Sequence, residues 1–96
     1  MKGNGHMRNY YSTINNVVTT FSNIEQDRDG FDHIIVRFER MNEVDGFDFA
    51  EGKLPETLIY KCYGFSEDEL FSLREYMCNN SSLIWEIAKE DGDNFA

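Results

Sequence analysis

One run of alternating residues constrains the fold more than any other part of the chain. The run FDHIIVRFERM, residues 31–41, places Ile34, Val36 and Phe38 at every second position, with mostly polar or charged residues between them. Successive side chains of a strand point to opposite faces of a sheet. The spacing therefore predicts a strand with one apolar face that another element must cover.

The residues that follow predict two more strands. NEVDG, residues 42–46, ends in Asp-Gly, a dipeptide typical of tight hairpin turns. Alternation then predicts a short second strand over residues 47–50, which Gly52 and Pro55 would end, and a third strand over residues 56–63. Short connections favour an antiparallel meander. We expect its covered face to bury Val36, Phe38, Phe47, Phe49, Leu58 and Tyr60.

Two signals conflict over residues 10–25, YYSTINNVVTTFSNIE. The β-branched and Asn-rich composition favours a strand. However, five apolar residues recur at helical spacing and the residues between them are polar. Because burial usually outweighs propensity, we predict a helix here, with a buried stripe of Ile14, Val17, Val18, Phe21 and Ile24.

Residues 64–80, GFSEDELFSLREYMCNN, carry the clearest helix signal. Ser66 and Glu69 form a capping-box pattern, and the acids of the first turn suit the positive end of the helix dipole. The two asparagines that close the run are predicted to end the helix. Residues 81–92 predict a second, short helix, with a strand over residues 83–88 as the alternative.

Together these elements predict a single α+β domain in the order α-β-β-β-α-α. A three-stranded antiparallel sheet would be packed by one N-terminal and two C-terminal helices over residues 10–92. Residues 1–9 are predicted to be a disordered or cloning-derived start, and residues 93–96 a frayed end. The sequence contains no apolar run of about 18 residues and no export signal, so we expect a cytoplasmic protein of a bacterial host.

The net charge of −9 is concentrated in the second half of the chain. Residues 1–40 hold five acids and five bases, whereas residues 41–96 hold thirteen acids and four bases. This excess of carboxylates disfavours direct binding to nucleic acid or to an anionic membrane, because phosphates need basic neutralisation. It favours a basic protein partner.

No motif of known catalytic chemistry occurs in the chain, so we expect a protein that is not an enzyme and has neither a cofactor nor a metal. Cys62 and Cys78 fit no metal or redox spacing and are expected to be reduced. The loop at residues 25–32 begins like an EF-hand, but Val36 stands where the twelfth-position acid belongs. LPET, residues 54–57, resembles a sortase signal but lacks the following glycine and an apolar tail.

The stretch HIIVRFERMNEVDGFDFAEG, residues 33–52, lies within the predicted α-β-β-β-α-α order in an acidic chain of 96 residues. In this layout the chain resembles the anti-CRISPR proteins, small phage-encoded inhibitors of Cas9. The resemblance implies a helix, a three-stranded sheet and two helices that present acids to the surface of Cas9 that reads the PAM. It also implies a complex that can depend on bound guide RNA.

We therefore predict a non-enzymatic inhibitor that imitates DNA and covers a basic nucleic-acid-binding groove, which on this resemblance belongs to a Cas nuclease. Arg37 and Arg40 in the first strand could neutralise part of the acidic surface. The alternatives are an immunity or antitoxin partner of a basic toxin nuclease, and a small acidic domain with no charge-driven partner. The acids predicted to contact the partner are Asp45, Asp48, Glu51, Glu67, Asp68 and Glu69.

Overall fold

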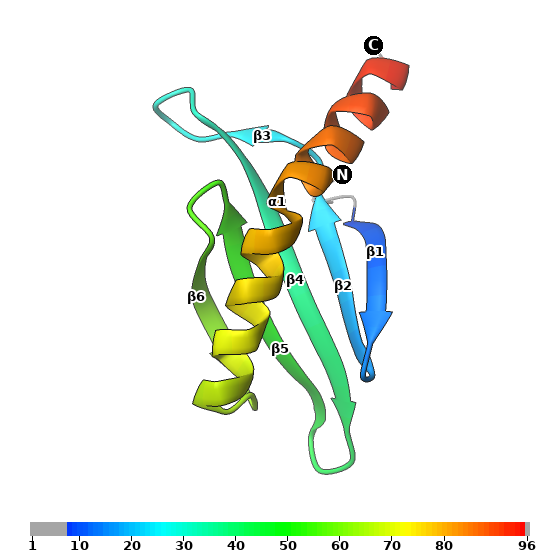
Figure 1. Ribbon diagram of the computed structural model, residues 1–96, viewed down its shortest axis with the longest axis vertical. Helices are drawn as coiled ribbons and strands as arrows, with labels where there is room; N and C mark the ends of the chain where they lie inside the picture. The colour runs from blue at the N-terminus through cyan, green and yellow to red at the C-terminus, as the bar shows by residue number, and fades with distance from the viewer. Residues whose placement is uncertain (1–7, 96) are drawn as a thin grey trace.

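The protein is a two-layer α+β domain in which one long helix lies across one face of an antiparallel sheet (Figure 1). The computed structural model describes residues 8–95, with side chains described for residues 8–90. The sheet has six strands in the order β1-β2-β4-β5-β6, and the short β3 pairs with the start of β4. The elements are β1 (Arg8–Ile14), β2 (Val17–Ser22), β3 (Glu25–Gln26), β4 (Asp32–Asn42), β5 (Gly46–Leu54), β6 (Leu58–Tyr63) and α1 (Glu67–Phe95).

The expected N-terminal helix over residues 10–25 is wrong, because this segment forms the β1–β2 hairpin. Asn15 and Asn16 connect the two strands with φ angles of 52° and 68°. Both angles are positive, as a two-residue type I′ turn requires, and asparagine tolerates this conformation better than most residues. The β-branched composition therefore prevailed over the helical spacing, since Phe21 of the same stripe is buried in a strand equally well.

The three-stranded sheet is also wrong, because β1, β2 and β3 add three strands to it. In addition, β5 is longer than expected and continues through Gly52. A Cβ atom at Gly52 would lie 2.7 Å from the sulfur of Met77 on α1. The glycine thus does not end the strand. It lets the helix approach the sheet closely, which is a common use of glycine inside a strand.

The side chains of β5 face the opposite way from the expected arrangement. Asn42 pairs with Gly46, so the connection has three residues, and Phe38 pairs with Ala50. Directly opposed residues share a face, and a one-residue change of register sends every side chain to the other face. Ala50 and Leu54 are therefore buried under α1, whereas Phe47 points away from it and is 55% exposed. Leu58 and Tyr60 are also more than half exposed, which corrects the expectation that they are core residues.

The two expected C-terminal helices are one continuous helix, α1. Its start follows the capping-box prediction: the Ser66 N–H donates to Glu69 Oε1 at 2.8 Å, and the Glu69 N–H donates to Ser66 Oγ at 3.1 Å. Asn80 does not end it. Its side-chain amide donates to the Tyr76 carbonyl at 2.7 Å and its oxygen accepts from the Tyr11 hydroxyl at 2.6 Å. Asn80 therefore joins the middle of α1 to β1, and residues 83–88 are helical rather than extended.

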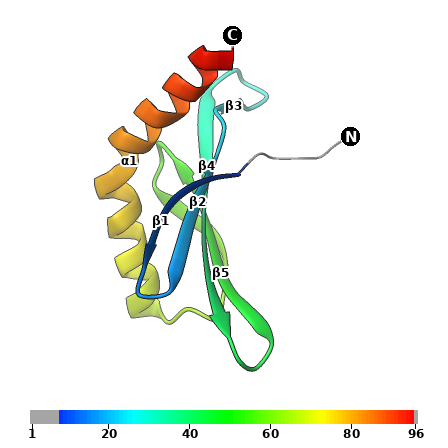
Figure 2. The same cartoon turned by 90° about the vertical axis from the view of Figure 1, so that its right-hand side faces the viewer.

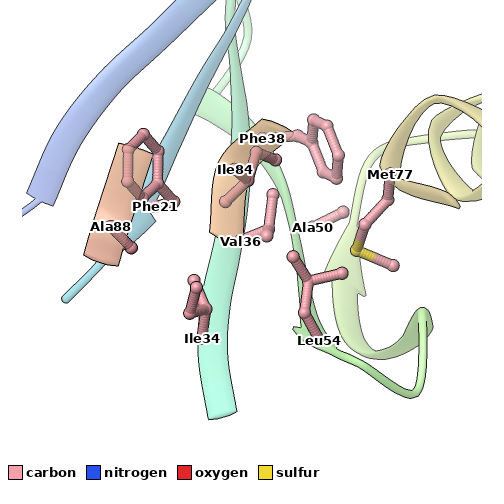
Figure 3. Close-up of a cluster of buried hydrophobic side chains, with 9 residues drawn as sticks. All are labelled: Phe21, Ile34, Val36, Phe38, Ala50, Leu54, Met77, Ile84 and Ala88. Carbon is pink, nitrogen blue, oxygen red and sulfur yellow. The ribbon is translucent and has the colours of Figure 1, made fainter. Parts of the chain in front are cut away.

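The core lies between α1 and the central strands (Figure 3). Met77, Ile84 and Ala88 form one stripe of the helix, because they are seven and four residues apart and therefore lie on the same side of it. Each large apolar side chain buried here contributes about 1.5–3 kcal/mol of transfer free energy. The nine buried hydrophobic residues are Phe21, Ile34, Val36, Phe38, Ala50, Leu54, Met77, Ile84 and Ala88.

The other face of the sheet carries no helix or strand from residues 8–95, as the side view shows (Figure 2). The described part of the chain begins its first strand at Arg8 and ends its helix at Phe95. The order β-β-β-β-β-β-α replaces the expected α-β-β-β-α-α. The layout on which the anti-CRISPR resemblance depended is absent, and the identification as a Cas9 inhibitor has no support in this fold.

Candidate interaction surfaces

Arg40 is the centre of an ion-pair network that joins three elements. Its Nη2 lies 2.7 Å from Asp48 Oδ2 on β5, and its Nη1 lies 2.6 Å from Glu69 Oε2 on α1. The Asn42 amide donates to the other oxygen of Asp48 at 2.7 Å, and the guanidinium stacks 4.5 Å from the centre of the Phe65 ring. Hydrogen bonding to Arg40 lowers the pKa of Glu69 to about 2. Two of the six predicted contact acids are thus held by one arginine.

Glu51 is paired in the same way on the opposite face of the sheet. The Arg37 Nη1 group donates to Glu51 Oε2 at 2.6 Å, and the Tyr60 hydroxyl donates to Glu51 Oε1 at 2.9 Å. Burial raises the pKa of Glu51, but the hydrogen bonds from Tyr60 and Arg37 outweigh it and the net pKa is lowered. Burial and the bond to Glu51 raise the pKa of Tyr60 to about 12. This carboxylate is therefore already neutralised within the chain.

The remaining three predicted acids differ from one another. Asp45 accepts a hydrogen bond from the Tyr63 hydroxyl, which lowers the pKa of the carboxyl group. Glu67 and Asp68 are exposed in the first turn of α1, and neither forms an ion pair with a described residue. The structure therefore does not gather the six acids into one unneutralised patch. It places Asp48 on β5, where it shares Arg40 with Glu69 of the first turn of α1, whereas Glu51 lies on the far face of the sheet and Asp45 at the hairpin tip.

The sequence contained a signal for this neutralisation. Arg37 pairs with Glu51 and Arg40 pairs with Asp48 across the β4–β5 hairpin, and each pair is equally spaced about the same turn. Opposite charges at directly opposed positions stabilise antiparallel strands. If residues 43–45 are taken as the connection, Asn42 pairs with Gly46, and the same register then pairs Arg40 with Asp48 and Arg37 with Glu51. The Asp-Gly dipeptide alone did not indicate this register.

Unneutralised negative charge is concentrated instead on α1. The helix holds eight acids and two bases, a net charge of −6, whereas residues 8–66 hold ten acids and six bases, a net charge of −4 in twice the length. Asp68, Glu75 and Glu86 are separated by about two and three helical turns, so they lie along one line opposite the buried stripe. All three side chains are exposed. This line of carboxylates is called the acidic crest below.

The uncovered face of the sheet differs from the acidic crest in chemistry. It consists of the outward residues of the six strands and is called the open sheet face below. Its apolar and aromatic members are Tyr10, Val18, Ile35, Met41, Phe47, Phe49, Leu58, Tyr60 and Tyr63. Its charged members are Arg8, Glu25, Arg37, Glu39, Glu51, Lys53 and Lys61.

A groove of about 360 Å³ lies between the β1–β2 hairpin and the first turns of α1. Its lining is mostly apolar and includes Val17, Phe38 and Leu73, with Arg40 and Asp68 among its charged groups.

No three described His, Cys, Asp or Glu side chains converge as metal ligands would. Over the described residues, no helix combines the length and the apolar character that crossing a membrane requires.

The combination of a six-stranded meander with one C-terminal helix therefore defines the class only as a small α+β domain with two chemically distinct surfaces. No family model, no curated protein and no solved structure matches the chain.

Proposed function

We propose that the protein is a non-enzymatic binding module that docks the acidic crest of α1 on a basic surface of a protein partner, such as a groove that binds nucleic acid. One observation carries this proposal: the arginines of the sheet neutralise nearby acids, whereas the crest acids have no basic partner among the described residues. Local folding requires the sheet pairs, but it does not require an unpaired row of carboxylates on the helix.

The geometry of α1 suits this role. Its 29 residues extend about 43 Å at about 1.5 Å per residue, so the charges are held along one continuous helix. The partly buried side of the helix is anchored by its core stripe and by the Asn80 hydrogen bonds. Carboxylates fixed in this way steer a basic partner at long range and do not need ordering when it binds.

Two exposed apolar side chains flank the acidic crest. Phe71 and Leu83 are about half exposed or more, although neither contributes to the core. Aromatic and apolar anchors at the centre of an interface usually supply most of the binding free energy, while charges supply rate and specificity. The crest with its flanking Phe71 and Leu83 has both components.

The proposal is tested by capturing partners on the tagged protein at low and high salt, with duplex DNA as competitor. The decisive variant changes the three crest acids to their amides, with Asp68 to asparagine and both Glu75 and Glu86 to glutamine, which removes three charges and keeps the side chains the same size. We expect binding of the captured partner to weaken about tenfold or more, and to weaken with salt in the wild type.

The matched control changes three exposed loop acids, Asp29, Glu43 and Glu56, to their amides, so that the net negative charge is reduced by the same amount as in the crest variant. This control should bind nearly as well as the wild type. Equal loss in both variants would assign the effect to net charge rather than to α1. Binding that is insensitive to salt and to both variants would refute the proposed function.

A further inference from the structure

We infer that the open sheet face is the contact surface between two copies of this chain, which pair through it face to face. This inference does not depend on the proposed function of α1, since it concerns the opposite layer of the molecule (Figure 2).

The composition of the open sheet face is that of an interface rather than of a solvated sheet surface. An antiparallel sheet with one wet face normally alternates apolar residues inward with polar residues outward. Here Phe47, Tyr60 and Tyr63 point outward and each is about half exposed, and Met41 is more exposed still. Aromatic residues, methionine and arginine are the residues enriched where proteins contact one another.

Most hydroxyl and carboxylate groups among the aromatic residues of this face have partners within the chain, although Thr20 Oγ1, His33 Nδ1 and Arg37 Nε are buried without a hydrogen-bond partner. The hydroxyls of Tyr60 and Tyr63 donate to Glu51 and Asp45. Arg37 is paired with Glu51 and its guanidinium lies 4.6 Å from the centre of the Phe49 ring. Covering these rings with another apolar surface would therefore leave few hydrogen-bonding groups without partners, which lowers the cost of desolvation.

Charge identifies a second copy as the occupant. The open sheet face carries four bases and three acids, a net charge of +1, so the rest of the chain carries −10. Two copies that approach by any other surface bring strongly negative regions together. Among the surfaces formed by residues 8–90, the open sheet face is the large one on which two identical chains can meet with opposite charges interleaved and little repulsion.

The size and the edges of the sheet agree with pairing by faces. Strands of 6–11 residues at about 3.3 Å per residue, spaced about 4.8 Å apart, give a face on the order of 600 Å². Two such faces bury about 1,200 Å², the lower end of the range for specific interfaces.

Both edge strands carry a register irregularity, at Tyr10/Ser12 in β1 and opposite Glu51/Gly52 in β6. Bulges of this kind discourage the alternative in which sheets extend edge to edge.

The experiment is sedimentation velocity of the full chain from micromolar to near-millimolar concentration. We expect a monomer–dimer equilibrium with a micromolar dissociation constant. The test variant is Phe47→Asp, and the matched control is Phe71→Asp on the helix. Both residues are aromatic and more than half exposed, at 55% and 60%, and both changes add one negative charge. Phe47→Asp should weaken the dimer about tenfold or more, and Phe71→Asp should leave it nearly unchanged.

Salt separates this inference from the proposed function. Raising the salt concentration from about 0.01 M to about 1 M shortens the Debye length from about 30 Å to about 3 Å. Screening should strengthen association of two acidic chains through the open sheet face, whereas binding of a basic partner to α1 should weaken. Concentration-dependent amide shifts in nuclear magnetic resonance spectra should map to β4, β5 and β6, which keeps the test informative if Phe47→Asp fails to fold.

Three outcomes would overturn the inference. They are a wild-type protein that stays monomeric at every concentration, a dimer that Phe71→Asp disrupts and Phe47→Asp does not, and concentration-dependent shifts that map to α1. A strict monomer would leave the open sheet face to a different protein. Failure of partner capture by α1 would leave the inference standing.

Discussion

Replacing Arg40 with methionine tests whether the ion-pair network fastens α1 to the sheet. Methionine keeps an apolar stem over Phe65 but removes the charge that Asp48 and Glu69 share. The Asp48 side chain is only 10% exposed, so its carboxylate would lose its counter-charge in a largely buried position. The Glu69 side chain is 43% exposed and would recover most of its interaction from water.

The expected loss of folding stability follows from the exposed fractions of the Asp48 and Glu69 side chains. Removing one partner of a fully buried pair costs about 3–5 kcal/mol, and the Asn42 hydrogen bond that remains on Asp48 brings this to about 2–3 kcal/mol. The Glu69 pair adds about 0.5 kcal/mol after allowance for solvent screening, and the stacking on Phe65 adds about 0.5 kcal/mol. We therefore expect the free energy of unfolding to fall by about 3–4 kcal/mol. In a chain of 96 residues this corresponds to a decrease of about 12–32 °C in Tm.

The pH dependence gives an independent check. The folded-state pKa of Glu69 is about 2, below its ordinary value of 4.5, so the unfolded chain binds this proton first as pH falls. The stability that Glu69 contributes is therefore complete above about pH 4.5 and is lost as pH falls toward 2. Arg40→Met removes the largest part of that contribution, while the hydrogen bond from the Ser66 N–H to Glu69 remains. The difference in free energy of unfolding between the wild type and Arg40→Met should therefore become smaller as pH falls from 5 to 2.

The assay is urea unfolding followed by far-ultraviolet circular dichroism at several pH values. The matched control is Arg74→Met, which removes an exposed arginine of α1 that forms no ion pair with a described residue, and it should change stability by less than about 0.5 kcal/mol. Adding Asp48→Asn to Arg40→Met should recover about 1–2 kcal/mol, because the unpaired charge is then gone. A loss below about 1 kcal/mol for Arg40→Met, or a loss equal to that of Arg74→Met, would refute the reasoning.

Three further outcomes follow from the packing, each measured as a change in the free energy of unfolding. Ile84→Ala should cost about 2–5 kcal/mol because it opens a cavity in the core, whereas Leu83→Ala, at an exposed neighbouring position, should cost less than about 1 kcal/mol; equal losses would place the helix in a different rotation. Gly52→Ala should cost about 1–3 kcal/mol because its new methyl group meets Met77, and no loss would show that the helix can move away. Asn16→Ala should cost about 1 kcal/mol because alanine resists a φ of 68°, and a stabilised variant would argue for the helix that the spacing predicted.

Local patterns predicted those features that depend on neighbours in sequence. The β4 alternation, the β4–β5 hairpin and the cap of Ser66 and Glu69 each depend on a few adjacent residues, and the structure contains all three. The helix predicted over residues 10–25 was wrong because the spacing of Val17 and Phe21 fits both a helical and an extended pattern. Only the Asn15-Asn16 turn distinguishes the two.

The candidate surfaces required information that no local pattern holds. Which face of β5 is buried depends on whether the connection after Asn42 has two or three residues, and the composition NEVDG allows either. The three-residue connection turned Phe47 outward and brought Asp48 to Arg40. The predicted acidic patch was therefore divided, while the open sheet face went unpredicted. The charge of α1 could be counted from the sequence, but its exposure on one line required the single continuous helix.

The attachment of α1 to β1 links the first described strand to the helix that follows the sheet in sequence. Tyr11 contacts Asn80 and Ser12 contacts Tyr76, so groups more than 60 residues apart must meet before either hydroxyl has its partner. During synthesis the ribosome releases all the strands before the helix that shields them. Phe21, Phe38 and Leu54 consequently stay exposed to water until α1 has been synthesised. A nascent chain stalled before residue 77 would expose the hydrophobic face of the sheet, and chaperones that bind such surfaces would act on this protein before α1 emerges.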